Sequence, residues 1–198
     1  MKRISRVFAV WLLALAPSLP ADEWVATFDP AASEISFVLQ ATGHKVRGVF
    51  AMRSGEIRWD TETGVAEGEI VVNSLGGETG NRRQDKKMHT EVLESALFAH
   101  FSYRPERLEG YVAAEGSSVV QLVGTLSIHG DAHALAIDAE VVATGGMLEA
   151  VASFQVPYVE WGLRDPSVFL LRVAKSVSVV VELSGTLRVA ERPAAGTP

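Results

Sequence analysis

The sequence predicts an all-β protein of eight to ten short strands with a single short helix. Apolar and β-branched residues alternate with other residues at a period of two along many short runs. Turn residues separate these runs at close intervals. One segment near the middle of the chain breaks this pattern and has a helical period instead. Many short strands at this spacing are typical of a sandwich or an up-and-down barrel.

The strands are expected in two groups, one on either side of the helical segment. In the first group, Asp29-Pro30 and Thr42-Gly43 are among the turn signals between runs. In the second group, His129-Gly130-Asp131 and Gly145-Gly146 have the composition of tight hairpin turns. The expected strands cover 35–40, 49–52, 56–59, 67–72, 101–103, 108–113, 119–128, 135–142, 147–156 and 173–189.

The helical segment runs from 81 to 94. Asn81 is a residue type that caps a helix N-terminus. The helical period places Met88, Val92 and Leu93 on one face, with Leu97 just beyond, and charged residues on the other face. A single amphipathic helix in a β protein is expected to cover one end or one side of the sheet structure.

The two ends of the chain differ in composition from the rest. Residues 1–21 combine three basic residues, an apolar run from Val7 to Ala16 and the small residue Ala21, which is the pattern of a cleavable signal peptide. We therefore expect a soluble, exported, periplasmic protein without a membrane span. Residues 22–190 form one expected domain, and the Pro- and Ala-rich stretch 191–198 is expected to be a disordered tail.

Charge and cysteine content exclude several functions. The chain of 198 residues has a net charge of −6, and three of its 18 Lys and Arg residues lie in the leader. An acidic domain is a poor candidate for binding nucleic acid, because that affinity comes mostly from neutralising phosphates. The absence of cysteine excludes disulfides, thiolate metal sites and a cysteine nucleophile.

The histidines invite a catalytic or metal interpretation. His129 and His133 are four residues apart, but they flank a turn, so the helical geometry of metal ligands does not apply. A hydrolase or isomerase using His129, Asp131 and Glu160 is an alternative, although no nucleophile–base motif is present. We expect no metal, no cofactor and no enzymatic activity.

Two further segments are candidates for ligand contacts. Arg82 and Arg83 lie at the start of the helical segment, where an anionic headgroup is one interpretation and a solvated helix face is the other. Asp85 is also able to turn inward and hold the loop by accepting from backbone groups. In the segment 154–167, Trp161 is expected either to plug a barrel end or to frame the mouth of a pocket.

An ordered set of motifs resembles the YceI-like family of polyisoprenoid-binding, lipocalin-like periplasmic proteins. Val46-Arg47-Gly48-Val49-Phe50 resembles a strand of that family, and the segment 79–88 resembles its loop and helix start. Gly124-Thr125-Leu126-Ser127-Ile128-His129-Gly130 resembles its hairpin. The resemblance extends from about Trp24 to Val189, and it departs from the family at Gln84, where an Arg is usual.

The resemblance implies an antiparallel up-and-down, lipocalin-like β-barrel around a hydrophobic tunnel. The implied function is binding or carrying a long-chain isoprenoid lipid of the polyprenyl or quinone type. A structural or stress-response barrel that acts through protein contacts without a lipid is the alternative, and a homodimer is left open. The expected pocket residues are Phe37, Phe50, Val71, Leu93, Leu97, Phe101, Leu126, Ile128 and Trp161, and Arg82 and Arg83 are the headgroup candidates.

Overall fold

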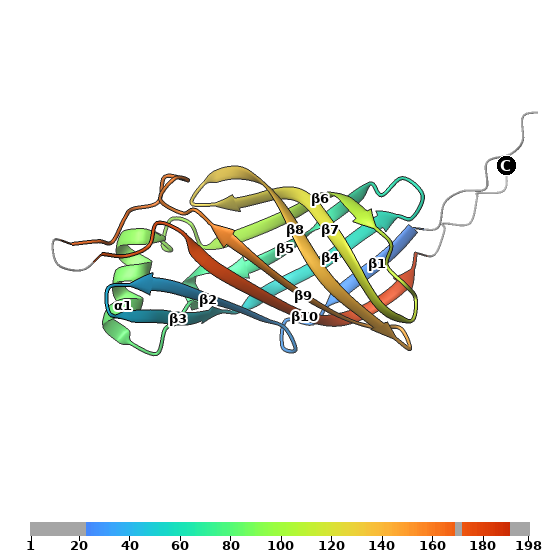
Figure 1. Ribbon diagram of the computed structural model, residues 1–198, viewed down its shortest axis with the longest axis horizontal. Helices are drawn as coiled ribbons and strands as arrows, with labels where there is room; N and C mark the ends of the chain where they lie inside the picture. Colours follow the sequence, from blue (N-terminus) through green and yellow to red (C-terminus); the bar gives the residue numbers. More distant parts are fainter. Residues whose placement is uncertain (1–22, 169–171, 191–198) are drawn as a thin grey trace, which may run out of the picture.

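The computed structural model describes residues 23–168 and 172–190, which form an elongated barrel (Figure 1). The predicted leader and tail therefore lie outside the described residues. The strands are β1 (Glu23–Phe28), β2 (Glu34–Ala41), β3 (His44–Phe50), β4 (Met52–Asp60), β5 (Ala66–Asn73), β6 (His100–Gly110), β7 (Gly116–Ile128), β8 (Asp131–Thr144), β9 (Met147–Val156) and β10 (Val177–Val189).

These ten segments make an eight-stranded, closed antiparallel barrel. β1 and β2 both pair with β10 and act as one long strand that is interrupted at 29–33. β3 and β4 act in the same way, with only Ala51 between them, and pair with β2 and β1. Pairing of β1 with β10 closes the ring, so neighbouring strands follow the order of the chain. The predicted up-and-down barrel is confirmed.

The side chains alternate between the inside and the outside of the barrel along each strand. In β8, Ile137, Ala139, Val141 and Ala143 are buried, whereas the residues between them are exposed. A strand alternates in this way because successive side chains leave opposite faces. The predicted hairpin turns are also confirmed, since His129-Gly130 and Gly145-Gly146 all have positive φ angles.

The connection between β5 and β6 contains the helical residues. It comprises the short 3₁₀ turn η1 (Ser74–Gly76), the α-helix α1 (Arg82–Lys87) and the π-helical turn η2 (Met88–Val92). The Asn81 side chain accepts from the backbone N–H groups of Arg83 and Gln84, as its position predicts for an N-cap. The helix lies across one end of the barrel (Figure 1). We call this end the helix end.

The strand motif at 46–50 contains a glycine at position 48 because there is no room for a side chain there. A Cβ atom at this position would lie 2.5 Å from the Phe37 ring and 2.6 Å from the carbonyl oxygen of Glu78. The Phe37 ring therefore lies over the Gly48 backbone and reaches Phe50, with 5.3 Å between the two ring centroids. A larger residue at this position would push these groups apart.

Candidate functional site

The inside of the barrel holds a cavity of about 360 Å³, and its wall is almost entirely apolar. Ligand pockets in proteins typically measure about 300–1,000 Å³. The wall includes Trp59 and Val112 near one end of the barrel and Lys87 and Pro166 at the other. The cavity thus extends along the barrel and is suited to a slender apolar ligand.

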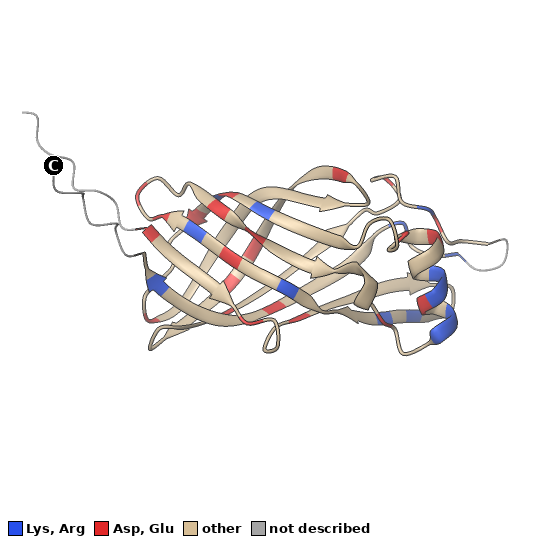
Figure 2. Cartoon of the chain, turned by 180° about the vertical axis from the view of Figure 1, so that it is seen from behind, with Lys and Arg blue, Asp and Glu red and all other residues tan. Residues whose placement is uncertain are grey.

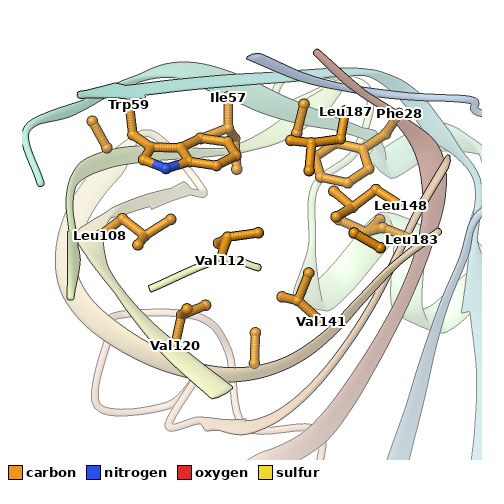
Figure 3. Close-up of a cluster of buried hydrophobic side chains, with 14 of the residues drawn as sticks. Phe28, Ile57, Trp59, Leu108, Val112, Val120, Val141, Leu148, Leu183 and Leu187 are labelled. Atoms are coloured by element: carbon orange, nitrogen blue, oxygen red, sulfur yellow. The ribbon is translucent and has the colours of Figure 1, made fainter. Parts of the chain in front are cut away.

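One end of the cavity is closed by a floor of apolar side chains. Val112 follows β6, and its side chain lies inside the barrel among Trp59, Leu108 and Val120 (Figure 3). Val112 is only 6% exposed. The connection between β6 and β7 therefore supplies a plug at this end, which we call the floor end.

The helix end has a wall that includes segments outside the strands. Met88 and Val92 from η2 contribute to it, together with Leu93 and, from the segment after β9, Tyr158 and Leu163. The Tyr158 hydroxyl donates to the Ala174 carbonyl at 2.8 Å, and burial raises the pKa of this phenol to about 12. This hydrogen bond joins residues 157–168 to residues 172–176 at the end of the barrel.

A buried hydrogen-bond network anchors the helical connection. The Ser74 hydroxyl donates to the Ser95 hydroxyl at 2.9 Å, and these residues are 0% and 1% exposed. His89 bonds Ser95 Oγ through Nδ1 at 2.9 Å and the Gly77 carbonyl through Nε2 at 2.8 Å. The network joins both ends of the connection to its helical turn, so it fixes the part of the chain that covers the cavity.

A second contact ties the connection to the hairpin between β7 and β8. His129 Nε2 lies 2.7 Å from a Glu94 carboxylate oxygen, and the His129 ring packs on Phe98 with 4.3 Å between centroids. His129 is thus bonded to Glu94 rather than to Asp131 or Glu160, with which the catalytic alternative grouped it.

The cavity wall at the helix end carries several polar groups. Thr79, Gln84 and Lys87 belong to the wall, and Lys87 Nζ donates to the Pro166 carbonyl at 2.9 Å. Asp85 accepts from the Thr79 amide and hydroxyl, each at 2.7 Å, so the predicted inward role of Asp85 is confirmed. Sequence reasoning missed Lys87, because its charge assigned it to the solvent-facing side of the helix.

Tyr103 places another polar group on the cavity wall. Its hydroxyl donates to the Leu122 carbonyl at 2.9 Å and has the Leu135 carbonyl at 3.2 Å. Burial raises the pKa of the Tyr103 phenol to about 12. The hydroxyl therefore bonds to the backbone of β7 and β8 and bridges neighbouring strands.

Most of the pocket residues expected from the sequence lie on the cavity wall. These are Phe37, Phe50, Leu93, Phe101, Leu126 and Ile128. Alternation along the strands identified all of them except Leu93, which the helical period identified, and contact with a ligand stays a prediction for each.

Three expected pocket residues lie outside the wall. The prediction that Val71 lines the pocket is wrong, because its neighbours Ile70 and Val72 take the inward positions of β5. Leu97 is 75% exposed, since the chain turns at Glu94, whose φ is 45°. Trp161 packs partly buried against the apolar side chains of the helix end without lining the cavity.

Trp161 instead stacks on His133, with ring centroids 4.2 Å apart and an interplanar angle of 4°. Within the described residues, the buried His133 Nε2 has no hydrogen-bond partner. No group of three or more His, Asp or Glu side chains suited to a metal ion is found in residues 23–168 and 172–190.

Arg82 and Arg83 are exposed and are not part of the cavity wall. Much of α1 is coloured as Lys and Arg in Figure 2. A headgroup contact by either arginine stays a prediction. Across the described part of the chain, no helix is long and apolar enough to cross a membrane.

The chain is similar to one known protein family and to several solved structures. A family model described as YceI-like domain matches residues 27–185. BcnA of Burkholderia cenocepacia has a TM-score of 0.66 at 14% identity, covering 80% of this chain and 99% of that one. The comparison with curated proteins finds no match.

Two further solved structures share the fold. A polyisoprenoid binding domain from Saccharophagus degradans, implicated in plant cell wall breakdown, has a TM-score of 0.61 at 15% identity and covers 81% of this chain and 97% of its own. The YCEI protein of Campylobacter jejuni has a TM-score of 0.57 at 13% identity, covering 74% of this chain and 86% of that one. At these identities the likeness shows the fold.

Proposed function

Because the chain belongs to the YceI-like family, we propose that it binds a long-chain isoprenoid lipid, of the polyprenyl or quinone type, inside its barrel. The apolar cavity that extends from Trp59 to Lys87 is the observation that carries this proposal. Each buried CH₂ group contributes about 0.8 kcal/mol, so a long tail binds tightly without any charge. The polyisoprenoid binding domain with the same fold supports this ligand class.

The proposed role is that of a carrier or binding protein rather than an enzyme. We also propose that residues 1–21 direct export to the periplasm, where a barrel of this kind would keep a water-insoluble lipid in solution. A homodimer stays a prediction. The ligand-free structural barrel is the less favoured alternative, because a barrel filled by its own side chains would leave no cavity on the scale observed here.

Native mass spectrometry of the protein purified from its own cell envelope tests this function. We expect a bound lipid whose mass identifies an isoprenoid class, and a mature N-terminus at or near Asp22. A protein that carries no lipid, and that also takes up no added long-chain polyprenol or quinone, would contradict the proposal.

Variants on the cavity wall give a second test. Phe101→Ala and Leu126→Ala remove side chains that line the cavity. We expect both variants to retain less lipid under conditions in which circular dichroism shows them folded, because these side chains form the surface that the tail would contact. Val71→Ala is the matched control, since this residue lies outside the wall.

A further inference from the structure

We propose that Lys87 holds the polar head of the bound lipid at the helix end, and that this head is an anionic oxygen group such as a phosphate. The proposal rests on the lipid-binding function proposed above. It adds the orientation of the ligand, the residue that meets the head and the chemical class of that head.

The helix presents one of its basic residues to the cavity. Gln84, Lys87 and Met88 are all on the cavity wall, as residues three and four apart lie on one helix face. Arg83 and Lys86 are exposed on the remaining face. Within residues 23–168 and 172–190, Lys87 is the sole Lys or Arg on the cavity wall.

At the helix end of the cavity, the Lys87 ammonium has a neutral hydrogen-bond partner. Its Nζ donates to the Pro166 carbonyl at 2.9 Å, and Pro166 is itself part of the wall. None of the ion pairs of the described residues includes Lys87. A partly buried cation gains more from an anionic acceptor than from a carbonyl, because it is attracted to a full negative charge and not only to the carbonyl dipole.

Neighbouring groups make this end of the cavity suitable for a polar head. The Thr79 hydroxyl lies 3.3 Å from Gln84 Oε1 and 2.7 Å from an Asp85 carboxylate oxygen. Gln84 lies one helical turn before Lys87 on the same wall, so its side-chain NH₂ group would supply a second donor to the head. The floor end offers apolar side chains such as Leu108 and Val112 instead, so the tail is expected to point there.

The test compares two ligands with the same tail, geranylgeranyl phosphate and geranylgeraniol, on the full protein. Lys87→Met removes the charge and keeps a flexible side chain of similar length. We expect Kd for the phosphate to rise at least tenfold, which equals about 1.4 kcal/mol, and Kd for the alcohol to stay unchanged. Inorganic phosphate, which lacks a tail, is expected not to displace either ligand.

Lys86→Met is the matched control, because this neighbouring lysine is exposed. Lys87→Gln replaces the first variant if thermal unfolding shows that Lys87→Met is not folded. Equal loss for phosphate and alcohol would overturn the headgroup assignment while leaving lipid binding intact. So would a loss confined to an Arg82→Ala/Arg83→Ala double variant, or tight binding of inorganic phosphate alone. If the wild-type protein binds neither lipid, the proposed function itself fails.

Discussion

The floor end and the helix end of the barrel close the same cavity by different means. At the floor end, apolar side chains such as Trp59, Leu108 and Val112 pack against one another inside the strands. At the helix end, residues 74–99, 157–168 and 172–176, which we call the cover, close the barrel and are held by hydrogen bonds such as that between Ser74 and Ser95. The floor thus depends on packing that the whole barrel shares, whereas the cover depends on a few polar contacts that are separable from the barrel.

The largest expected effect is at the floor. Trp59→Ala removes a side chain that is 5% exposed, and we expect it to lower the free energy of unfolding by about 3–5 kcal/mol. Urea denaturation measures the change. Trp161→Ala is the same chemical change at the helix end, where the ring is partly exposed, and its loss should be clearly smaller. Equal losses would mean that both ends are parts of one core.

An intermediate effect is expected from the polar anchor of the cover. Ser95→Ala leaves the buried Ser74 hydroxyl and His89 Nδ1 without their partner, which costs about 1–3 kcal/mol. Hydrogen exchange should show lost protection in 82–92 and little change in β8. Thr90→Ala is the control, since its hydroxyl bonds the Lys86 carbonyl at the surface. Uniform loss of protection across the barrel would contradict a separable cover.

The smallest effect at neutral pH concerns the two buried phenols, Tyr103 in the strand wall and Tyr158 in the cover. Their folded-state pKa values are raised to about 12, against about 10 in an unfolded chain. The stability that the neutral phenols contribute is therefore complete below about pH 10 and is lost as pH rises towards 12. An absorbance titration of a Tyr111→Phe variant, which keeps these two tyrosines, should show their ionisation near pH 12.

Adding Tyr158→Phe to the Tyr111→Phe variant leaves Tyr103 as the one tyrosine that titrates. If the cover opens independently, the remaining Tyr103 should keep its high pKa after the Tyr158–Ala174 bond is gone. A fall of the Tyr103 pKa in this variant would show that the cover and the strand wall open together.

The sequence predicts the barrel better than it predicts the cover. Alternation in β8 is regular, so the inward positions of Ile137 and Val141 follow from the period of two. In β5, three consecutive apolar residues at 70–72 hide that period, which is why Val71 was assigned to the wrong face. The period of two shows which side chains point into the barrel only where polar residues alternate with apolar ones.

Segments outside the strands depend on contacts that are distant in sequence. The positive φ of Glu94 ends the helical periodicity and turns Leu97 outward. No pattern in the neighbouring sequence predicts this turn. Val112 becomes a plug only because the connection after β6 turns into the barrel (Figure 3). Lys87 and Arg83 look equivalent in the sequence, and the docking of the helix on the barrel is what distinguishes them.

The seam between β1 and β10 has a consequence for how the chain folds. It pairs Trp24 with Val189, the most distant partners of the barrel along the chain. Contacts of such large sequence separation form slowly, because a long loop must close before they contribute. The hairpins from β6 to β10 are local and are expected to form first. Until the seam closes, β1 and β10 keep unpaired edges that are able to join other chains, so refolding yield should fall as protein concentration rises.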